Sequence, residues 1–342
     1  MAGDVGAEDE VVGGERRTTD QCGGRRLAHI HHPHIIRRPV AEPSGYRRKV
    51  RMGADLRQIT VVSGKGGTGK TTVLASFAAL ADGAVVADCD VDAANLHLLL
   101  HPTLRKSEEF LGSKVAVRDA ARCQQAGECE RRCRFAAITV DEVDTLACEG
   151  CGLCVLACPH QALRLEPVVN GHWYVSATNY GPMVHARLLP GGESSGRLVT
   201  KVRQLAEDVA LSTGRGLVLI DGPPGIGCTA VAAMADVDLA LIVTEPTLSG
   251  IHDMERVVGL ASHFRLPIAV ITNKWDLNAK NALSIRHFCA ERQIPILGEL
   301  PFDDEVPRSL GAQVPLVEYG GGPVGQGIRE AWQRLNGQLL DG

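Results

Sequence analysis

The sequence lacks any apolar run long enough to cross a lipid bilayer, and it lacks a large excess of charge of either sign. Its 342 residues carry 36 Lys and Arg against 40 Asp and Glu, a formal net charge of -4. A spanning helix needs about 20 consecutive apolar residues, and a nearly neutral chain has no overall attraction to nucleic acid. The acidic opening "MAGDVGAEDE" also lacks the basic and then apolar character of a secretory signal. We therefore expect a cytoplasmic protein with no membrane span and no nucleic-acid partner.

The first 55 residues lack helical or strand periodicity and mix Gly, Arg, His and Pro. This composition is typical of a disordered N-terminal extension. The first clear strand begins only at residue 57, so Met52 is an alternative start, in which case residues 1–51 are not part of the native protein.

From residue 56 onward, short apolar β-branched runs alternate with helical segments. The stretches "QITVVSG", "TTVLASFAALADG" and "AVVADCD" follow one another, and further strands are expected at 216–221, 239–245, 267–273 and 295–301. This alternation predicts an α/β fold with a mostly parallel sheet covered by helices on both faces. One helix is expected over 249–264 with Ser249 as its N-cap, and another begins at Ser194 or Ser195.

The alternation stops between residues 113 and 168, where cysteines and short strand-like pieces occur. We expect an inserted small α+β domain there, between two parts of the main domain, 56–112 and 169–342. Seven of the eleven cysteines lie within residues 123–158 at short spacings. In a chain with cytosolic nucleotide motifs, such spacing favours metal ligation over disulfides.

A phosphate-binding loop follows the first predicted strand and opens the first predicted helix. The pattern G-x4-G-K-[ST] lets backbone N–H groups and a helix N-terminus bind a polyphosphate, while Lys70 reaches the terminal phosphates and Thr71 binds Mg2+. Asp221 ends the strand "GLVLID" and is the expected water-mediated Mg2+ partner. The predicted nucleotide contacts in the loop are Gly64, Lys65, Gly66, Gly67, Thr68, Gly69, Lys70, Thr71 and Thr72.

The cysteine block contains one complete ferredoxin run, Cys148-x2-Cys151-x2-Cys154-x3-Cys158-Pro, and an earlier incomplete one. In two-cluster ferredoxins the fourth cysteine of each run binds the other cluster. Cys133 should therefore complete a [4Fe–4S] site, and Ala126 occupies the position where the earlier run lacks a cysteine. The two predicted ligand sets are Cys133, Cys148, Cys151 and Cys154, and Cys123, Cys129 and Cys158.

The three-thiolate set suits a [3Fe–4S] cluster, or a [4Fe–4S] cluster whose fourth iron takes water, a partner's side chain or a residue such as Glu128. Loss of this second cluster, with Cys123 and Cys129 merely packed, is the alternative. Cys89 is expected to point into the sheet, and Cys228 and Cys289 are expected to be packed thiols.

These motifs together resemble the MinD/ParA superfamily of P-loop ATPases, relatives of the nitrogenase iron protein, in a subgroup that carries an inserted ferredoxin domain. The resemblance covers residues 57–342 and rests on the G-K-G-G loop start and the cysteine runs. It implies a nucleotide-dependent homodimer in which Lys65 reaches the ATP of the facing subunit. It also implies that Asp90 of the D-x-D stretch positions the attacking water, with Asp88 as an alternative for orienting the loop or the waters of Mg2+.

The same resemblance places Asn273 beside adenine and the loop "LPFDDEV" next to the base. Asn273-Lys274-x-Asp276 also resembles the guanine-reading motif of GTPases, so GTP stays an alternative. Cys228 follows Asp221 by seven residues, an offset that resembles a cluster cysteine of the nitrogenase iron protein.

The motifs predict a P-loop ATPase, with Lys65, Lys70 and Asp90 as catalytic residues and with slow or partner-stimulated hydrolysis. The favoured hypothesis couples nucleotide state to electron transfer from the clusters to a redox partner. The alternative is an ATP-dependent cluster scaffold or carrier that delivers clusters to apo-proteins. A ParA-like positioning switch is less favoured, because the C-terminal segment is too short and too weakly basic for a membrane anchor.

Overall fold

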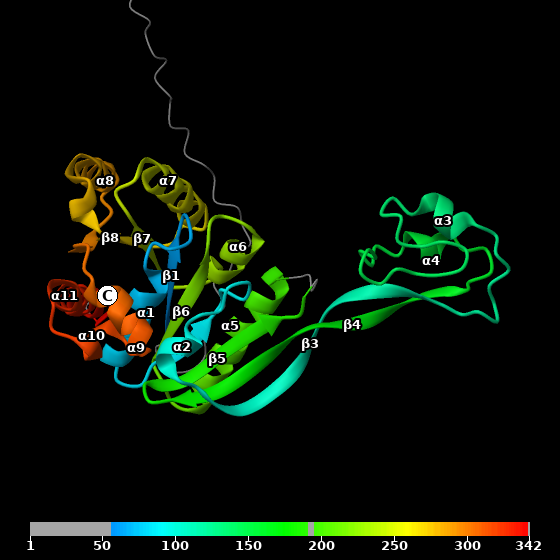
Figure 1. Cartoon of the computed structure of the whole chain (residues 1–342), viewed down its shortest axis with the longest axis horizontal. Coiled ribbons are helices and arrows are strands. Elements are labelled where there is room, and N and C mark those ends of the chain that lie inside the picture. The colour runs from blue at the N-terminus through cyan, green and yellow to red at the C-terminus, as the bar shows by residue number, and fades with distance from the viewer. Residues whose placement is uncertain (1–55, 191–194, 341–342) are drawn as a thin grey trace, which may run out of the picture. The chain divides into compact units, whose positions relative to one another are not determined.

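The computed structural model describes residues 56–190 and 195–340, so Cys22, Met52 and Ser194 lie outside the described residues. The described residues build one nine-stranded sheet with the strand order β3-β4-β5-β2-β6-β1-β7-β8-β9 (Figure 1). The strands are β1 Arg57–Ser63, β2 Val85–Asp88, β3 Thr103–Arg118, β4 Leu163–Thr178, β5 Gly181–Leu188, β6 Leu217–Pro224, β7 Leu239–Thr244, β8 Ile268–Asn273 and β9 Ile296–Leu300.

The sheet is mostly parallel, as predicted. Strands β5, β2, β6, β1, β7, β8 and β9 pair with their neighbours in parallel, whereas β4 is antiparallel to both β3 and β5. The carboxyl ends of β1, β2 and β6 therefore meet at one edge, where an open parallel sheet binds its ligands.

Helices cover both faces of the sheet, which confirms the predicted layers. Apolar residues of α1, α2, α10 and α11 pack on one face, and those of α5, α6, α7 and α8 pack on the other. The helices are α1 Lys70–Leu80, α2 His97–Leu100, α3 Glu128–Arg132, α4 Leu153–Ala157, α5 Ser195–Ser212, α6 Cys228–Met234, α7 Leu248–His263, α8 Ala279–Glu291, α9 Glu305–Ala312, α10 Leu316–Tyr319 and α11 Pro323–Leu340, with a 3-10 turn at Trp275–Leu277.

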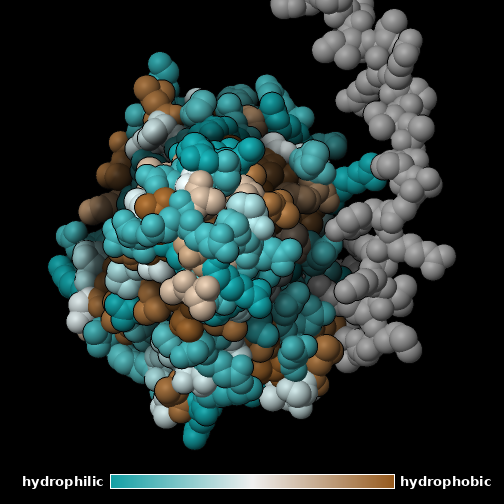
Figure 2. Space-filling model, turned by 90° about the vertical axis from the view of Figure 1, so that its right-hand side faces the viewer, coloured by the Kyte–Doolittle hydropathy of each residue, from teal (hydrophilic) through white to brown (hydrophobic). Residues whose placement is uncertain are grey.

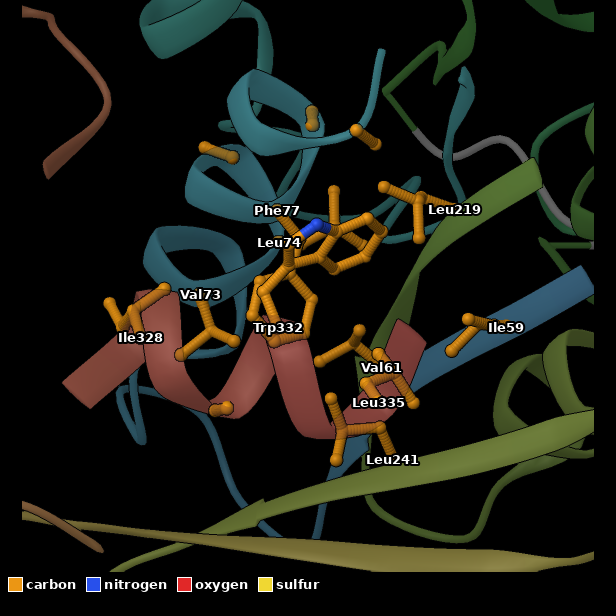
Figure 3. Packing of buried hydrophobic residues seen from close by; sticks show 14 of the residues in the cluster. Ile59, Val61, Val73, Leu74, Phe77, Leu219, Leu241, Ile328, Trp332 and Leu335 are labelled. Atoms are coloured by element: carbon orange, nitrogen blue, oxygen red, sulfur yellow. The ribbon is translucent and has the colours of Figure 1, made fainter. Parts of the chain in front are cut away.

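The first face contains Phe77, which is among the largest fully buried side chains of the described residues. Phe77 of α1 lies against Trp332 of α11, with ring centroids 5.1 Å apart, and Figure 3 shows both above apolar residues of β1, β6 and β7. Burial of each large apolar side chain contributes about 1.5–3 kcal/mol to folding. This packing fixes α1, and with it the phosphate loop that precedes the helix.

Two sequence predictions need correction. Helix α7 begins at Leu248, and its N-cap is Thr247, whose hydroxyl accepts a hydrogen bond from the Gly250 amide at 3.0 Å. Ser249 lies inside the first turn, so it cannot act as the N-cap. The sequence predicts no strand in the first part of the stretch 172–210, which is expected only to connect the insertion to the main domain, but this part contains the second half of β4, which pairs with β5, and β5, which pairs with β2.

Strands β3 and β4 continue past the end of β5 as a two-stranded ribbon. Residues 171–177 of β4 pair with both β3 and β5, whereas residues 163–169 pair only with β3 among the described strands. Helices α3 and α4 and all seven clustered cysteines lie in the segment between these two strands (Figure 1). The predicted domain limits at 112/113 and 168/169 fall inside β3 and β4. No helix in the described part of the chain is long and apolar enough to span a membrane.

Candidate functional site

The phosphate loop runs from the end of β1 into α1. Gly69 has φ +98°, a left-handed conformation that glycine adopts without strain, and a Cβ there would lie 2.5 Å from the Asn273 side-chain nitrogen. Gly64 has a similar constraint, because a Cβ at this position would lie 2.2 Å from the Cβ of Asp253 in α7. The glycines therefore permit both the backbone turn and the close approach of α7.

Three carboxylates gather at the carboxyl ends of β2 and β6. The Thr71 hydroxyl donates to Asp221 at 2.8 Å, and the Asp90 amide donates to Asp88 at 3.2 Å. Burial, and after it the charge of Asp221, raises the pKa of Asp88. Burial likewise raises the pKa of Asp221 and of Asp90, although Lys70 acts in the opposite direction on both. Excess negative charge at this depth favours binding of a cation.

The residues present fit the Mg2+ that this loop implies. One oxygen of Asp88 and one of Asp221 are buried without a hydrogen-bond partner in the described part of the chain, as is the hydroxyl of Thr68. Buried polar atoms are rarely left unpaired, and carboxylate and hydroxyl oxygens are the ligands that Mg2+ and its bound waters use. Asp88 is 1% exposed, whereas Asp90 is only half-buried and so is the carboxylate open to a water molecule.

Lys65 is held by its own subunit in this structure. Its ammonium group pairs with Glu245, at the end of β7, and lies 3.3 Å from the Thr247 hydroxyl. Lys274 contacts the other oxygen of Glu245 at 3.3 Å. Burial raises the pKa of Glu245, but hydrogen bonds and charge from the two lysines outweigh it and leave that pKa below its usual value. The sequence analysis did not identify Glu245, because this residue belongs to no recognisable motif and is distinguished only by its position directly after β7.

The region predicted to bind the base contains Asn273, whose amide donates to the Thr68 carbonyl at 2.8 Å. Asp276, the acidic residue of the GTPase-like motif, accepts a hydrogen bond from the Phe302 amide at 2.7 Å. Phe302 belongs to the loop "LPFDDEV", so this contact joins the two segments that are expected beside the base.

One recess beside the ribbon brings together Cys133, Cys148, Cys151 and Cys154. It encloses about 360 Å3, including the space at its open mouth, and Phe135, Ile138 and Leu165 supply apolar walls. The Ala116 amide of β3 donates to the Cys148 sulfur at 3.5 Å. Hydrogen bonds to the sulfurs and apolar surroundings are two of the features that set the potential of an iron–sulfur cluster.

A second recess brings together Cys123, Cys129 and Cys158, with Ala126 and Glu128 also on its wall. Its volume, about 350 Å3 with its mouth, is close to that of the first. Both oxygens of Glu128 are engaged, one by Arg131 at 2.5 Å and one by Arg132 at 3.3 Å. This recess therefore lacks a fourth thiolate, although its volume is similar to that of the four-cysteine recess. The carboxylate on its wall, Glu128, is already paired with two arginines.

In the described part of the chain, no three His, Cys, Asp or Glu side chains are close enough to hold one metal ion. The cysteines of a cubane each bind a different iron, so they lie farther apart than the ligands of one ion. All ten described cysteines are free thiols.

The isolated cysteines differ from one another. Cys89 and Cys289 are buried, as expected, and burial raises the pKa of both thiols. The expectation for Cys228 was wrong, because this residue is exposed at the start of α6. The loop that follows β6 ends at Cys228, where α6 begins at the surface. The seven-residue spacing from Asp221 cannot predict this exposure.

With this geometry established, the chain can be compared with known proteins. A model of the CobQ/CobB/MinD/ParA nucleotide-binding domain matches residues 59–316. The chain belongs to the CobQ/CobB/MinD/ParA family. The predicted P-loop ATPase is thereby confirmed.

Individual relatives cover different shares of the chain. The chain is 30% identical to an uncharacterized protein of Methanocaldococcus jannaschii, over 82% of this chain and 96% of that protein. It is 28% identical to the iron–sulfur cluster carrier protein of Pyrococcus abyssi, over 43% of this chain and 54% of that one. The Pyrococcus horikoshii MinD complexed with Mg-ADP has the same fold, with 19% identity, a TM-score of 0.52, and coverage of 82% of this chain and 96% of that structure.

Proposed function

We propose that this ATPase of the CobQ/CobB/MinD/ParA family uses its nucleotide state to control electron transfer through two ferredoxin-type iron–sulfur clusters. The observation that carries the proposal is the pair of recesses at the end of the ribbon, one lined by four cysteines and the other by three. The ligand sets found there are the two that crossed ferredoxin ligation requires. Bound clusters would supply one-electron chemistry that the protein's own side chains lack.

The four-cysteine recess is assigned to a [4Fe–4S] cluster with Cys133, Cys148, Cys151 and Cys154 as ligands. The three-cysteine recess is assigned to a [3Fe–4S] cluster, or to a [4Fe–4S] cluster whose fourth iron lacks a protein thiolate. We infer that Glu128 does not fill that position, because Arg131 and Arg132 hold its two oxygens. The electron acceptor or donor is a separate redox protein.

The ATPase residues have distinct proposed tasks. Lys70 neutralises charge on the terminal phosphates, and Thr71 holds Mg2+, with Asp221 acting through a bound water. Asp90 orients the attacking water, because it is more exposed than Asp88 and lies near Lys70. Asn273 contacts the loop beneath the base. Loss of the terminal phosphate would release the segment after Asp221, which is made of the end of β6 and the loop at residues 225–227.

We further infer that ATP joins two copies of the chain, with Lys65 of each reaching the phosphates bound by the other. Lys65 must then leave Glu245, so the pair between them competes with dimer formation. The side chain of Lys65 is 32% exposed and that of Glu245 is 12% exposed, so the pair is partly screened by solvent.

Replacing Glu245 with glutamine should therefore strengthen the ATP-dependent dimer. We expect the dimer dissociation constant to fall by about threefold, because a partly exposed ion pair is worth under about 1 kcal/mol. Sedimentation velocity with a non-hydrolysable ATP analogue measures this constant. Glu299→Gln is the matched control, since Glu299 pairs with Arg286 on the surface and should not affect the dimer. An unchanged or weaker dimer in Glu245→Gln would argue against competition for Lys65.

A second candidate function is delivery of clusters to apo-proteins. Two observations favour it: the relative from Pyrococcus abyssi is an iron–sulfur cluster carrier, and the three-thiolate recess would hold its cargo lightly. A transferable cluster needs an accessible and weakly held site. The four-thiolate recess does not meet that description, so electron transfer is the preferred function.

Anaerobic purification followed by iron quantitation and EPR, with and without ATP, tests the two functions against each other. Electron transfer predicts that ATP shifts the reduction potential of a cluster while the iron stays bound. Delivery predicts that ATP releases iron and sulfide to an apo-acceptor. Iron loss to the acceptor would exclude the first function, and a shifted potential with full retention would exclude the second.

The nuclearity of the three-thiolate cluster can be tested with Ala126→Cys. The added thiolate should convert this site to a complete cubane, raising bound iron by about one per chain if the native cluster is [3Fe–4S] and removing its oxidised EPR signal. Ala121→Cys, two residues before Cys123 and outside the recess, is the control and should leave iron and EPR unchanged. If Ala126→Cys also changes neither, the native cluster is not a [3Fe–4S] cluster.

A further inference from the structure

The ribbon leaves the sheet at a joint made of Gly112 and Ser113 on β3 and Asn170 on β4. The pairing register shifts twice at this point: Phe110 pairs with Gly171, Leu111 with Val169 and Ser113 with Val168, so Asn170 on β4 and Gly112 on β3 are each skipped. Each strand therefore has extra residues here, the mark of a β-bulge. A bulge bends its strand and interrupts the ladder, so the ribbon's direction is set by whatever holds the bulge.

The Asn170 side chain holds the bulge on β3. Its oxygen accepts hydrogen bonds from the Gly112 amide at 3.0 Å, from the Ser113 amide at 2.7 Å and from the Ser113 hydroxyl at 3.0 Å. Asn170 is 6% exposed, and its own carbonyl accepts from the Leu189 amide at 2.8 Å. One buried amide side chain thus replaces the ladder bonds that the bulge breaks.

The joint coincides with the end of the packed sheet. Pairing between β4 and β5 ends at Gly171 and Leu188, and a Cβ on Gly171 would lie 2.5 Å from the Arg187 carbonyl. On the sheet side, Phe110 and Trp173 are buried in the core beneath α5. On the ribbon side, β4 pairs only with β3 among the described strands. Resistance to bending therefore falls sharply between Gly171 and Val168.

Helix α5 holds the joint from the ATPase side. The guanidinium of Arg197, in the first turn of α5, donates to the Gly112 carbonyl. The neighbouring Gly196 lies against the first residue of α6, because a Cβ on it would be 3.4 Å from the Cys228 carbonyl oxygen. Arg203, farther along α5, donates to the Ala232 carbonyl of α6 at 2.8 Å.

Helix α6 in turn begins where the loop after Asp221 ends. The Gly225 amide of that loop donates to the Ser63 carbonyl, at the start of the phosphate loop, at 2.8 Å. Asp221 itself accepts from Thr71. An unbroken series of contacts thus runs from the Mg2+ side of the nucleotide site through α6 and α5 to the Gly112 carbonyl.

We propose that the joint of Gly112, Ser113 and Asn170 is a hinge, and that Arg197 is the positioning residue through which nucleotide state sets the direction of the ribbon. A shift of the loop after Asp221 displaces α6, α6 displaces the first turn of α5, and Arg197 pulls or releases the bulge. The biological purpose of the movement rests on the proposed function, since the ribbon carries the cysteine recesses. The movement itself requires only the ATPase and the hinge.

Distance measurements between two nitroxide labels test the hinge directly. Ketone-bearing residues that replace Leu146, in the cysteine lobe, and Leu283, on α8, carry the labels without modifying any cysteine; these leucines are 88% and 50% exposed. Labelled chains are diluted into unlabelled protein, purified without air, and measured by pulsed EPR with ADP or with a non-hydrolysable ATP analogue. We expect the two nucleotides to give different distance distributions in the wild type and the same distribution in Arg197→Ala.

Arg215→Ala is the matched control, because Arg215 also donates to a backbone carbonyl, that of Gly83, but lies off this path. It should keep the nucleotide-dependent shift, and Asn170→Asp, which retains the acceptor oxygen, should keep it as well. Hydrogen exchange supplies a second measurement: the Gly112 and Ser113 amides should exchange about fivefold faster in Asn170→Ala, the loss of roughly one hydrogen bond.

The hinge would be overturned if the wild type gave the same label distance distribution with both nucleotides. It would also be overturned if the distribution of Arg197→Ala shifted with nucleotide as that of the wild type does. These outcomes are separable from the fate of the proposed function. If the protein binds no iron but its ribbon moves with the nucleotide, the hinge is supported and the electron-transfer function is contradicted. If the cluster potential responds to ATP while the distance between the labels stays fixed, the electron-transfer function is supported and the hinge is contradicted.

Discussion

Replacing Lys70 with alanine is expected to lower ATP turnover by about 10²–10³-fold, which is the usual cost of removing one preorganised charge or donor from a developing anion. Lys70 begins α1, is 5% exposed, and acts electrostatically on both Asp90 and Asp221. It therefore lies where the terminal phosphates meet the proposed Mg2+ ligands. Phosphate release at saturating MgATP measures the effect.

Lys274→Ala is the matched control for this experiment. Lys274 also approaches the loop, 3.4 Å from the Gly67 carbonyl, but its ammonium group is directed to Glu245 rather than to the buried carboxylates. We expect its turnover to stay within about tenfold of the wild type. Thermal unfolding of both variants checks that the fold is retained. A Lys70→Ala enzyme that is only mildly impaired would remove Lys70 from the catalytic role.

Much of the nucleotide-binding domain could be predicted because its signals are local. Strands β1 and β7 are rich in apolar β-branched residues and are buried almost throughout. Such strands occur where helices cover both faces of a parallel sheet. The phosphate loop is equally local, since Gly69 needs its left-handed backbone wherever this motif joins a strand to a helix.

The edge of the sheet could not be predicted in the same way. Residues 103–109 of β3 are all exposed, and β4 is only half-buried along much of its length, so neither strand has the apolar signal of β1. Their strand character depends on pairing between residues that are far apart in sequence. The hinge has the same origin, because Asn170 lies 58 residues from Gly112, and Arg197 lies 85 residues from it.

The ion pair between Lys65 and Glu245 shows a different limit of prediction from sequence. The loop motif identifies Lys65 but not the conformation of its side chain, which is set by a residue 180 positions later at the end of β7. The family resemblance predicts the role of Lys65 across a dimer. The structure adds the intramolecular contact to Glu245, which would have to break for Lys65 to take this proposed role.

Cys154→Ala and Cys158→Ala are expected to remove different clusters, although the two residues are only four positions apart. Cys154 lies in α4 and lines the four-cysteine recess, whereas Cys158 follows α4 and lines the three-cysteine recess. Cys154→Ala should lose about four irons per chain and the EPR signal of the reduced cubane. Cys158→Ala should lose about three or four irons and keep that signal.

Iron analysis and EPR of the anaerobically prepared variants measure both losses, and Cys228→Ala is the control because Cys228 lies outside both recesses. If ligation followed sequence order, Cys148, Cys151, Cys154 and Cys158 would bind one cluster, and the two variants would lose the same signal. Crossed ligation separates them, because it takes Cys133 into the cubane and gives Cys158 to the site that lacks a fourth thiolate. Identical spectra for the two variants would therefore contradict both assigned ligand sets at once, whereas iron loss from Cys228→Ala would reveal a ligand outside the ribbon.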